Sequence, residues 1–257
     1  MSAPKLAGKR ALVTGGSRGI GASIVRRLAA DGAAVAVNYV ADERSATQLV
    51  DELTAAGARA VAVQADVSDS AQTHRLVDRV VEEFGGLDLL ASNAGVEHFG
   101  PLASITPADF ERVFTINVGG QLFAAQAAAA AMGDGGRIVL TSSVSARVAV
   151  HRHTLYAASK AAVSAMVLNL APELAERGIA INAVAPGGTA TDMATTHAAA
   201  YIHPALAAVG AEAALASMNA LARLAEPTEI AAVVAFLLSP DASYLTGATI
   251  DASGGWI

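Results

Sequence analysis

The sequence of 257 residues predicts one α/β domain, built on a doubly wound parallel sheet of about seven strands with helices on both faces. Short apolar runs alternate along the chain with longer amphipathic segments, which is typical of repeated strand–helix units. No linker, repeat or low-complexity tract interrupts this alternation. We therefore treat residues 1–257 as a single domain.

The expected strands are apolar on both faces, as strands of a helix-covered parallel sheet must be. Parallel neighbours require crossover connections, which are right-handed in nearly all proteins. The strands are expected at Ala11–Thr14, Ala34–Tyr39, Ala60–Gln64, Leu87–Ala91, Arg137–Thr141, Ala180–Ala185 and Ala248–Ile250.

Helices are expected between the strands because start and stop residues frame those segments. Gly32, Gly57 and the pair Gly85-Gly86 follow the first three, and Asp69 is a favourable N-cap residue for the third. The expected helices are Ile20–Ala30, Glu43–Ala56, Asp69–Glu83, about Pro107–Met132, Thr154–Arg177 and Thr228–Leu238.

The alanine-rich segment 188–225 breaks the alternation before the last strand. It is either a surface helical hairpin or a substrate-binding lid over the carboxyl ends of the strands, where open α/β sheets bind ligands. We favour the lid.

The composition excludes several classes of function. The chain is 53% hydrophobic with a net charge of −6, which opposes disorder and a nucleic-acid-binding role. Without cysteine it has no disulfide, thiolate metal site or cysteine nucleophile. Residues 1–10 carry no apolar signal segment, and no run reaches the roughly 20 apolar residues of a membrane helix. We expect a soluble cytoplasmic protein.

The first strand leads directly into a glycine-rich turn, TGGSRGIG at residues 14–21, and then into a helix. Glycines allow a tight turn, and the helix N-terminus offers free N–H groups and a positive dipole end to a pyrophosphate. The spacing differs from the general G-x-G-x-x-G fingerprint, and a plain tight connection is the alternative. We expect a Rossmann-type dinucleotide site.

The second strand ends in Asn38-Tyr39, without the acidic residue that usually holds the ribose 2′-hydroxyl of NAD. Arg18 lies inside the glycine turn, where it could pair with a 2′-phosphate, although a solvated surface arginine is the alternative. Asp42 and Glu43 would repel that phosphate if they face it, and Arg44 could offset them. The pattern favours NADP(H) over NAD(H).

Tyr156 and Lys160 are four residues apart in an expected helix and so share one face. An ammonium beside the phenol should lower the pKa of Tyr156, making it a usable general acid or base. The fifth strand ends in two serines, which present a hydroxyl for a carbonyl oxygen. Both Ser142 and Ser143 are candidates at this point.

With these motifs in place, the chain resembles the short-chain dehydrogenase/reductase family over essentially its whole length. The resemblance implies a nicotinamide-dependent oxidoreductase that is a homotetramer or homodimer and acts on a small-molecule ketone or alcohol, with no nucleic acid or membrane partner and no metal. The matching elements are residues 14–21, Asp66-Val67, Asn93-Ala94-Gly95, Asn117, Ser143, Tyr156 with Lys160, and Pro186-Gly187.

The resemblance also implies roles for single residues. Tyr156 would give a proton to the carbonyl oxygen as hydride arrives, Ser143 would orient the carbonyl, and Asn117 would hold a water of the proton relay. Lys160 would bind the nicotinamide ribose. The expected cofactor contacts are Gly15, Ser17, Arg18, Gly19, Ile20, Asn38, Tyr39, Asp66 (adenine), Val67, Asn93 (ribose), Ala94, Gly95, Tyr156, Lys160, Pro186, Gly187, Thr189 and Thr191 (carboxamide), and Met193.

A narrower resemblance links the chain to the polyhydroxynaphthalene and versicolorin reductase branch, through Ser92–Gly100, Thr106–Asn117, Ala185–Met193 and Tyr201-Ile202. It implies NADPH and a bulky, often aromatic or cyclic, ketone. Met193 and Tyr201 would then contact the substrate together with Ser143 and Tyr156.

Two other functions stay open. A 3-oxoacyl thioester reductase ranks second, because a carrier-protein partner would need a basic patch and residues 132–135 offer none beside Arg177. A non-catalytic dinucleotide-binding regulator is remote, because the tyrosine, lysine and serine are all present.

Several further residues are expected near the substrate. His98, His151 and His153 are placed at the pocket rim, and no carboxylate stands at metal-ligand spacing from the two later histidines. Trp256 is interpreted first as a core or subunit-interface anchor, with a pocket wall as the alternative.

Overall fold

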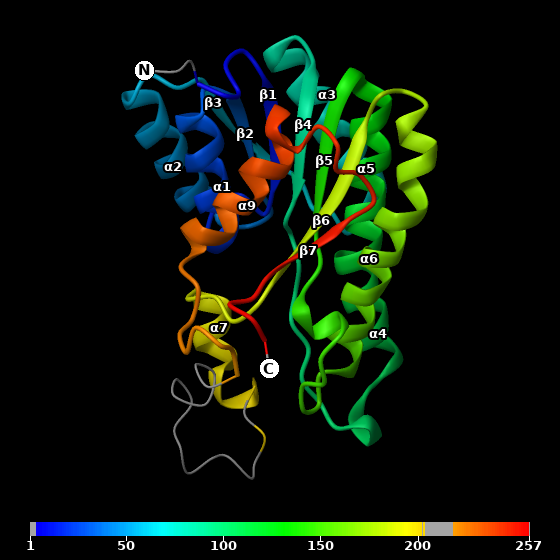
Figure 1. Cartoon of the computed structure of the whole chain (residues 1–257). Coiled ribbons are helices and arrows are strands. Elements are labelled where there is room, and N and C mark those ends of the chain that lie inside the picture. Colours follow the sequence, from blue (N-terminus) through cyan, green and yellow to red (C-terminus); the bar gives the residue numbers. More distant parts are fainter. Residues whose placement is uncertain (1–3, 202, 204–217, 257) are drawn as a thin grey trace.

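A parallel sheet crosses the whole molecule, with helices packed on both sides (Figure 1). The computed structural model describes residues 4–201, 203 and 218–256. Within that part, seven strands lie in the order β3-β2-β1-β4-β5-β6-β7, and each neighbouring pair is parallel. The predicted fold class is confirmed. The strands are β1 Arg10–Thr14, β2 Ala34–Tyr39, β3 Ala60–Gln64, β4 Leu87–Ser92, β5 Met132–Thr141, β6 Ala180–Pro186 and β7 Thr249–Ala252.

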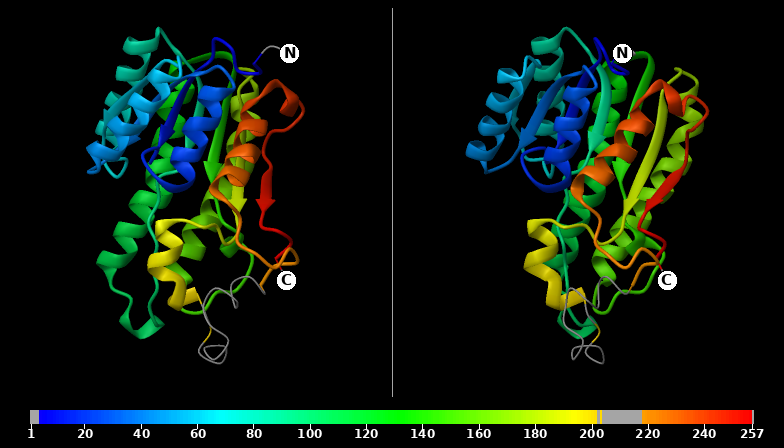
Figure 2. Two further views of the ribbon diagram at one scale, coloured as in Figure 1. Left: turned by 90° about the vertical axis from the view of Figure 1, so that its left-hand side faces the viewer. Right: turned by 60° about the vertical axis from the view of Figure 1, so that its left-hand side comes forward.

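Two helical layers enclose the sheet, as the turned views in Figure 2 show. Helices α1, α2 and α9 contribute to the core on one face, and α3, α5 and α6 to the core on the other. The helices are α1 Gly19–Ala30, α2 Glu43–Ala55, α3 Ser70–Phe84, α4 Pro107–Phe114, α5 Gly120–Ala131, α6 Thr154–Ala175, α7 Asp192–His197 and α9 Pro227–Leu238. No helix among the described residues is long and apolar enough to cross a membrane.

Burial on both faces explains the continuous apolar strands. Ala11 and Val13 of β1 belong to the core shared with α1 and α9, whereas Leu12 between them belongs to the core shared with α3 and α5. All three side chains are completely buried. Successive side chains of a strand point to opposite faces, so a strand covered on both sides needs an apolar residue at every position.

The helix predicted at about Pro107–Met132 is confirmed over Pro107–Ala131, with a π-helical turn inside it that was not predicted. Helix α4 ends at Phe114, the π-helical segment η2 spans Thr115–Gly119, and α5 begins at Gly120. A π-turn holds one residue more than an α-turn and often marks a functional site. Here it carries Asn117, whose amide contacts the loop after β4.

The carboxyl ends of the strands point toward the end of the molecule that holds α4 and α7 (Figure 1). The described part of the segment 188–225 lies at this end and contains α7 and the short helix η4, Ala198–Tyr201. Residues 202 and 204–217 of the predicted lid, Ile202 among them, lie outside the described residues. The lid role stays a prediction.

Close packing of the β1–α1 turn leaves no room for a side chain at Gly21. A Cβ at this position would overlap the carbonyl oxygen of Gly15 and lie 2.8 Å from the Asn93 amide nitrogen. We expect Gly21→Ala to lower the free energy of unfolding by about 1–3 kcal/mol, as overpacked substitutions do. Denaturant unfolding measures this loss. Gly133→Ala is the control, because its Cβ would meet no atom within 4 Å; equal stability of the two variants would contradict the packing argument.

Candidate active site

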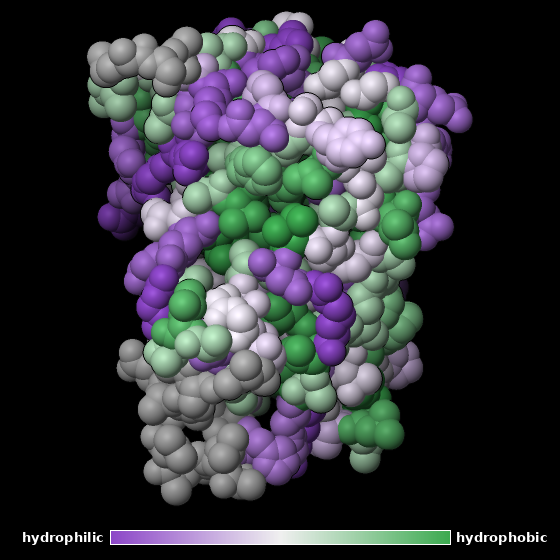
Figure 3. Space-filling view, viewed as in Figure 1, coloured by the Kyte–Doolittle hydropathy of each residue, from purple (hydrophilic) through white to green (hydrophobic). Residues whose placement is uncertain are grey.

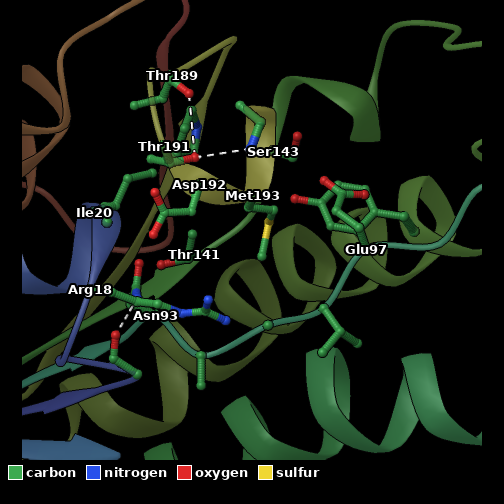
Figure 4. A pocket seen from close by; sticks show the side chains of 18 of the residues that line it. Arg18, Ile20, Asn93, Glu97, Thr141, Ser143, Thr189, Thr191, Asp192 and Met193 are labelled. Atoms are coloured by element: carbon green, nitrogen blue, oxygen red, sulfur yellow. Dashed lines mark hydrogen bonds between the residues drawn. The ribbon is translucent and has the colours of Figure 1, made fainter. Parts of the chain in front are cut away.

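A cavity of about 570 Å³ opens along the carboxyl edge of the sheet. Every predicted cofactor or substrate residue lines it, from Gly15 and Arg18 at one end to Tyr156 and Tyr201 at the other. Figure 4 shows Arg18 and Glu97 on opposite sides of this space, with Met193 between them in that view. Hydrophobic residues gather at the centre of the face seen in Figure 3, and hydrophilic residues surround them. Strand ends, loops and α7 thus bring residues far apart in sequence to one hollow.

Two asparagines and a threonine hold the glycine-rich turn against the strand ends. Asn38 Oδ1 accepts a hydrogen bond from the Gly15 N–H at 3.2 Å, and the Asn93 amide donates to the Gly15 carbonyl at 3.2 Å. The Thr14 hydroxyl oxygen accepts from the backbone N–H groups of Asn93 and Ala94, at 3.0 and 3.2 Å. In this structure, Asn38 and Asn93 therefore hold the turn in place.

The turn leaves a helix terminus open. Arg18 is the N-cap residue of α1 and makes no side-chain capping bond, and the first turn holds no acidic residue. The free N–H groups and positive dipole end can therefore accept an anionic group. Gly15 and Gly19 adopt φ values of 59° and 54°, which residues with a Cβ rarely adopt.

Asp42 was expected to repel a 2′-phosphate if it faced that group, but its carboxylate is hydrogen-bonded within the first turn of α2. Its carboxylate caps α2 by accepting from the Ser45 N–H at 3.0 Å. That bond, with weaker help from the Arg18 and Arg44 guanidinium groups, holds the pKa of Asp42 below its usual range. Arg18 and Arg44 therefore place positive charge around this acid, next to the end of β2.

Lys160 lies buried beside the end of β5 and close to Gly95 in the loop after β4. Its ammonium donates to the Thr141 carbonyl at 2.8 Å and stands 5.5 Å from the centre of the Tyr156 ring. Burial lowers the pKa of Lys160 to about 8, although the nearby Glu97 carboxylate acts in the opposite direction.

Tyr156 departs from the electrostatic expectation. Burial raises the pKa of its phenol above the usual value, the Glu97 charge raises it further, and a hydrogen bond with Ser143 acts in the opposite direction. The expected lowering by Lys160 is absent, since only burial, Glu97 and Ser143 act on this pKa. A tyrosine in this environment holds its proton firmly and suits the role of general acid.

The two serines after β5 have different partners. The Ser142 hydroxyl faces α6, where it donates to the Lys160 carbonyl and pairs with Ser164, each at 2.8 Å. The Ser143 hydroxyl accepts from the Ser145 N–H at 3.1 Å and reaches the Tyr156 phenol. Ser143 is the one positioned beside the candidate general acid.

Asn117 does not line the cavity, although its neighbour Ile116 does. Its amide accepts from the Val96 N–H at 2.8 Å and donates to the Val96 carbonyl and the Ser159 hydroxyl, at 2.9 and 3.1 Å. The side chain thus ties the loop after β4 to α6. Its role in a water relay stays a prediction.

The remaining predicted residues follow strand ends. Asp66 lines the cavity after β3 and accepts from the Ser68 N–H at 2.9 Å. Thr191 caps α7 by accepting from the Ala194 N–H at 3.2 Å, and Met193 on that helix is 38% exposed. Tyr201 reaches back from η4 to the loop after β4. Figure 4 shows Thr191 and Met193 turned to the pocket.

Glu97 is a cavity residue that the sequence patterns did not predict. This acid lies five residues after β4, lines the cavity, and its Oε2 is 2.6 Å from Nε2 of His153. Sequence spacing could not reveal this contact, since the two residues are 56 positions apart in sequence. The available signal was an acidic residue, Glu97, two positions after the Asn93–Gly95 motif.

The three histidines expected at the pocket rim and Trp256 also lie in other places than their first interpretations gave. None of His98, His151 and His153 lines the cavity. His98 faces Asp109 of α4 at 3.7 Å, His151 packs edge-on against His203, and His153 is buried behind Tyr156. Trp256 forms part of the cavity wall, which was the second interpretation of that residue. No group of three or more potential metal ligands gathers among the described residues.

The buried ammonium of Lys160 should destabilise the fold. Because the pKa of Lys160 is about 8 in the folded protein and 10.5 ordinarily, the cost is complete below pH 8 and disappears as the pH rises toward 10.5. We expect Lys160→Met to raise the free energy of unfolding by about 1–3 kcal/mol near pH 7 and by less near pH 10. Denaturant melts of this variant and of the half-exposed control Lys9→Met measure the difference; a gain independent of pH would contradict it.

Comparison with known proteins agrees with this geometry. The family model described as "Enoyl-(Acyl carrier protein) reductase" matches residues 15–257. The hydroxynaphthalene reductase-like protein Arp2 of Metarhizium brunneum is 43% identical over 254 residues, which cover 97% of this chain and 95% of that protein. A short-chain dehydrogenase of Burkholderia cenocepacia in complex with NADP is 43% identical, with a TM-score of 0.88 and 98% of both chains covered.

A third relative is the angucycline C-6 ketoreductase LanV with bound NADP, at 37% identity and a TM-score of 0.88, with 98% of this chain and 96% of that chain covered. The glycine-rich turn, the tyrosine–lysine pair and the serine at the end of β5 meet at one cavity, on a fold shared over nearly the whole chain. The chain belongs to the short-chain dehydrogenase/reductase family.

Proposed function

We propose that the protein is an NADPH-dependent oxidoreductase that reduces a ketone, preferably a bulky cyclic or aromatic one, to a secondary alcohol. The main support for this proposal is the position of two hydroxyl groups in the cavity. The Tyr156 phenol and the Ser143 hydroxyl both line the cavity that begins at the open N-terminus of α1. A candidate proton donor and the residues expected to bind a dinucleotide thus line one cavity.

The residues present fit a nicotinamide dinucleotide. The cavity combines the open helix terminus with two glycines of positive φ, Gly15 and Gly19, where backbone can approach a pyrophosphate closely. Arg18 would pair with a 2′-phosphate, and β2 ends in Asn38-Tyr39 with no acid to hold a free 2′-hydroxyl. The NADP complexes of two relatives support the same choice.

Further residues would hold the remaining parts of the dinucleotide. Asp66 would contact the adenine, Asn93 the adjoining ribose, Lys160 the nicotinamide ribose, and Thr189 and Thr191 the carboxamide. All five line the cavity. The remaining predicted cofactor residues line the same wall, which supports the assignment.

The chain's own groups supply the proton and orient the substrate. Bound reduced nicotinamide provides a hydride to the carbonyl carbon. Ser143 would donate a hydrogen bond that orients the carbonyl oxygen, and Tyr156 would transfer its phenolic proton to that oxygen as negative charge develops. A phenol with a raised pKa remains protonated until that moment.

The substrate end of the cavity favours a large apolar molecule. Ile116, Val150, Met193, Tyr201 and Trp256 line it. Such walls match a ring system better than a flexible acyl chain. An acyl chain bound to a carrier protein would in addition need a basic docking patch on the surface. The reductase names of Arp2 and LanV support a cyclic ketone. A 3-oxoacyl thioester is the second candidate, favoured by the acyl-carrier-protein term in the description of the matching family model.

Turnover should depend on Tyr156. We expect Tyr156→Phe to lower the rate of ketone-dependent NADPH oxidation by at least about a hundredfold, because the proton donor is lost. NADPH binding, measured by calorimetry, should change little. The assay uses a bicyclic aromatic ketone, a small cyclic diketone and an acetoacetyl thioester. Retained turnover would reject the assignment of Tyr156, preference for the thioester would favour the second candidate, and binding without turnover of any ketone would favour a regulator.

Arg18 should set the choice of cofactor. We expect Arg18→Ala to raise the KM for NADPH about ten- to a hundredfold, as loss of a charge-assisted phosphate contact does, and to leave the KM for NADH nearly unchanged. Steady-state kinetics with both cofactors checks this. Arg79→Ala, an exposed arginine on α3 outside the cavity, is the control. An equal rise for both cofactors would show that Arg18 does not read the 2′-phosphate.

We also propose that the protein forms a homodimer or homotetramer, in the cytoplasm. Phe123 on α5 and Leu168 on α6 support assembly, since both are large apolar side chains that are 36% and 64% exposed. Contact with another subunit would bury them.

A further inference from the structure

A buried carboxylate stands behind the candidate proton donor and has no part in the steps above. Glu97 follows β4, and its side chain is only 2% exposed. Burial of an ionised carboxylate is costly unless donors surround it. Its partners should therefore reveal what it is for.

The two oxygens of Glu97 contact two different segments. Oε1 accepts from the Tyr201 hydroxyl at 2.5 Å, and Oε2 is 2.6 Å from Nε2 of His153. Tyr201 belongs to η4, within the segment 188–225, and His153 directly precedes α6. One carboxylate thus joins the loop after β4 to the catalytic helix and to the presumed lid.

The His153 imidazole is held in a stack of rings. It lies parallel to Phe99 on one side and to Tyr156 on the other, with ring centroids 4.3 and 4.5 Å apart and interplanar angles of 7° and 13°. Tyr201 meets Phe99 edge-on at 4.9 Å. The bond to Glu97 fixes how the imidazole is turned within this stack, and the stack supports the back of the Tyr156 ring.

The charge of Glu97 also acts on Tyr156. Five polar or ionisable groups surround that phenol: Glu97 from the loop after β4, Ser143 from the end of β5, His153 before α6, Lys160 on α6 and Tyr201 on η4. Among them, Glu97 raises the pKa of Tyr156, after the larger effect of burial. Loss of its charge should make the proton of Tyr156 easier to lose.

We propose that Glu97 is a positioning residue for the reduction: its carboxylate holds His153 against the Tyr156 ring and holds Tyr201 in the wall of the substrate pocket. This inference rests on the proposed ketone reduction. It assigns a function to a residue outside the tyrosine, lysine and serine of the site. A purely structural role, in which Glu97 only joins three segments, is the competing explanation.

Two substitutions separate the geometry of Glu97 from its charge. Glu97→Asp keeps the charge but is too short to reach both partners, so we expect kcat for the ketone to fall about tenfold through lost orientation of Tyr156. Glu97→Gln keeps the length and removes the charge. In this variant, kcat/KM for reduction should begin to fall on the alkaline side at a pH about one unit lower than in the wild type, as expected for loss of a neighbouring charge. Glu111→Gln, an exposed carboxylate on α4, should alter neither quantity.

A spectroscopic measurement tests the same inference without turnover. The chain has four tyrosines, so ¹³Cζ-tyrosine labelling gives four NMR signals, which Tyr156→Phe and Tyr201→Phe assign. In Glu97→Gln we expect the Tyr156 signal to titrate at lower pH than in the wild type and the Tyr201 signal to shift. In Glu111→Gln both signals should match the wild type.

The outcomes distinguish the two proposals. An unchanged kcat in Glu97→Asp, together with unchanged Tyr156 and Tyr201 signals in Glu97→Gln, overturns the role of Glu97. Kinetic losses that are equal for Glu97→Asp and Glu97→Gln, without movement of the alkaline fall in kcat/KM, also overturn it in favour of a structural role. If the wild type reduces no ketone while the Tyr156 signal moves as expected, the proposed function fails and the coupling of Glu97 to Tyr156 is upheld.

Discussion

The close approach of backbone within the β1–α1 turn is the contact on which the rest of the site depends. Gly21 lies against the Gly15 carbonyl with no room for a Cβ, and the Asn38 and Asn93 amides hold Gly15 from the two strands beside β1. This arrangement leaves the N-terminus of α1 open toward the cavity. A bulkier turn would fill the space where an anionic cofactor group can meet free N–H groups.

The chemistry at the other end of the cavity depends on burial. Lys160 is buried and Tyr156 is partly buried, and this burial displaces the pKa of each toward its neutral form. An isolated phenol near an ammonium would behave differently, but here the ammonium donates to the Thr141 carbonyl and a carboxylate stands nearby. The site therefore favours a protonated tyrosine, which agrees with proton donation to a carbonyl.

The surroundings of Tyr156 come from segments far apart in the sequence. Glu97 follows β4, Ser143 follows β5, and Tyr201 lies after β6. They meet because all strands of a parallel sheet end at the same edge, so that the loops after successive strands converge. Glu97 then bridges two of these segments through His153 and Tyr201.

Local patterns predicted much of this protein. Apolar runs predicted all seven strands, since burial on both faces of a sheet leaves a direct trace in sequence. The glycine-rich turn and the Tyr156–Lys160 spacing predicted residues that line the cavity, because those motifs are short and lie within one turn or one helix. Patterns failed where a side chain contacts a distant segment. The helical pattern did not predict the π-turn at Asn117, whose amide is bonded to Val96 in the loop after β4.

The sequence by itself determined the fold class, the family resemblance and the pair of residues most suited to catalysis, because each is encoded in neighbouring residues. Only the tertiary structure decided that Glu97 lies behind Tyr156, that Trp256 forms a cavity wall and that the Tyr156 pKa is raised. Electrostatic and stacking interactions depend on distances through space, and the order of residues along a chain does not state those distances.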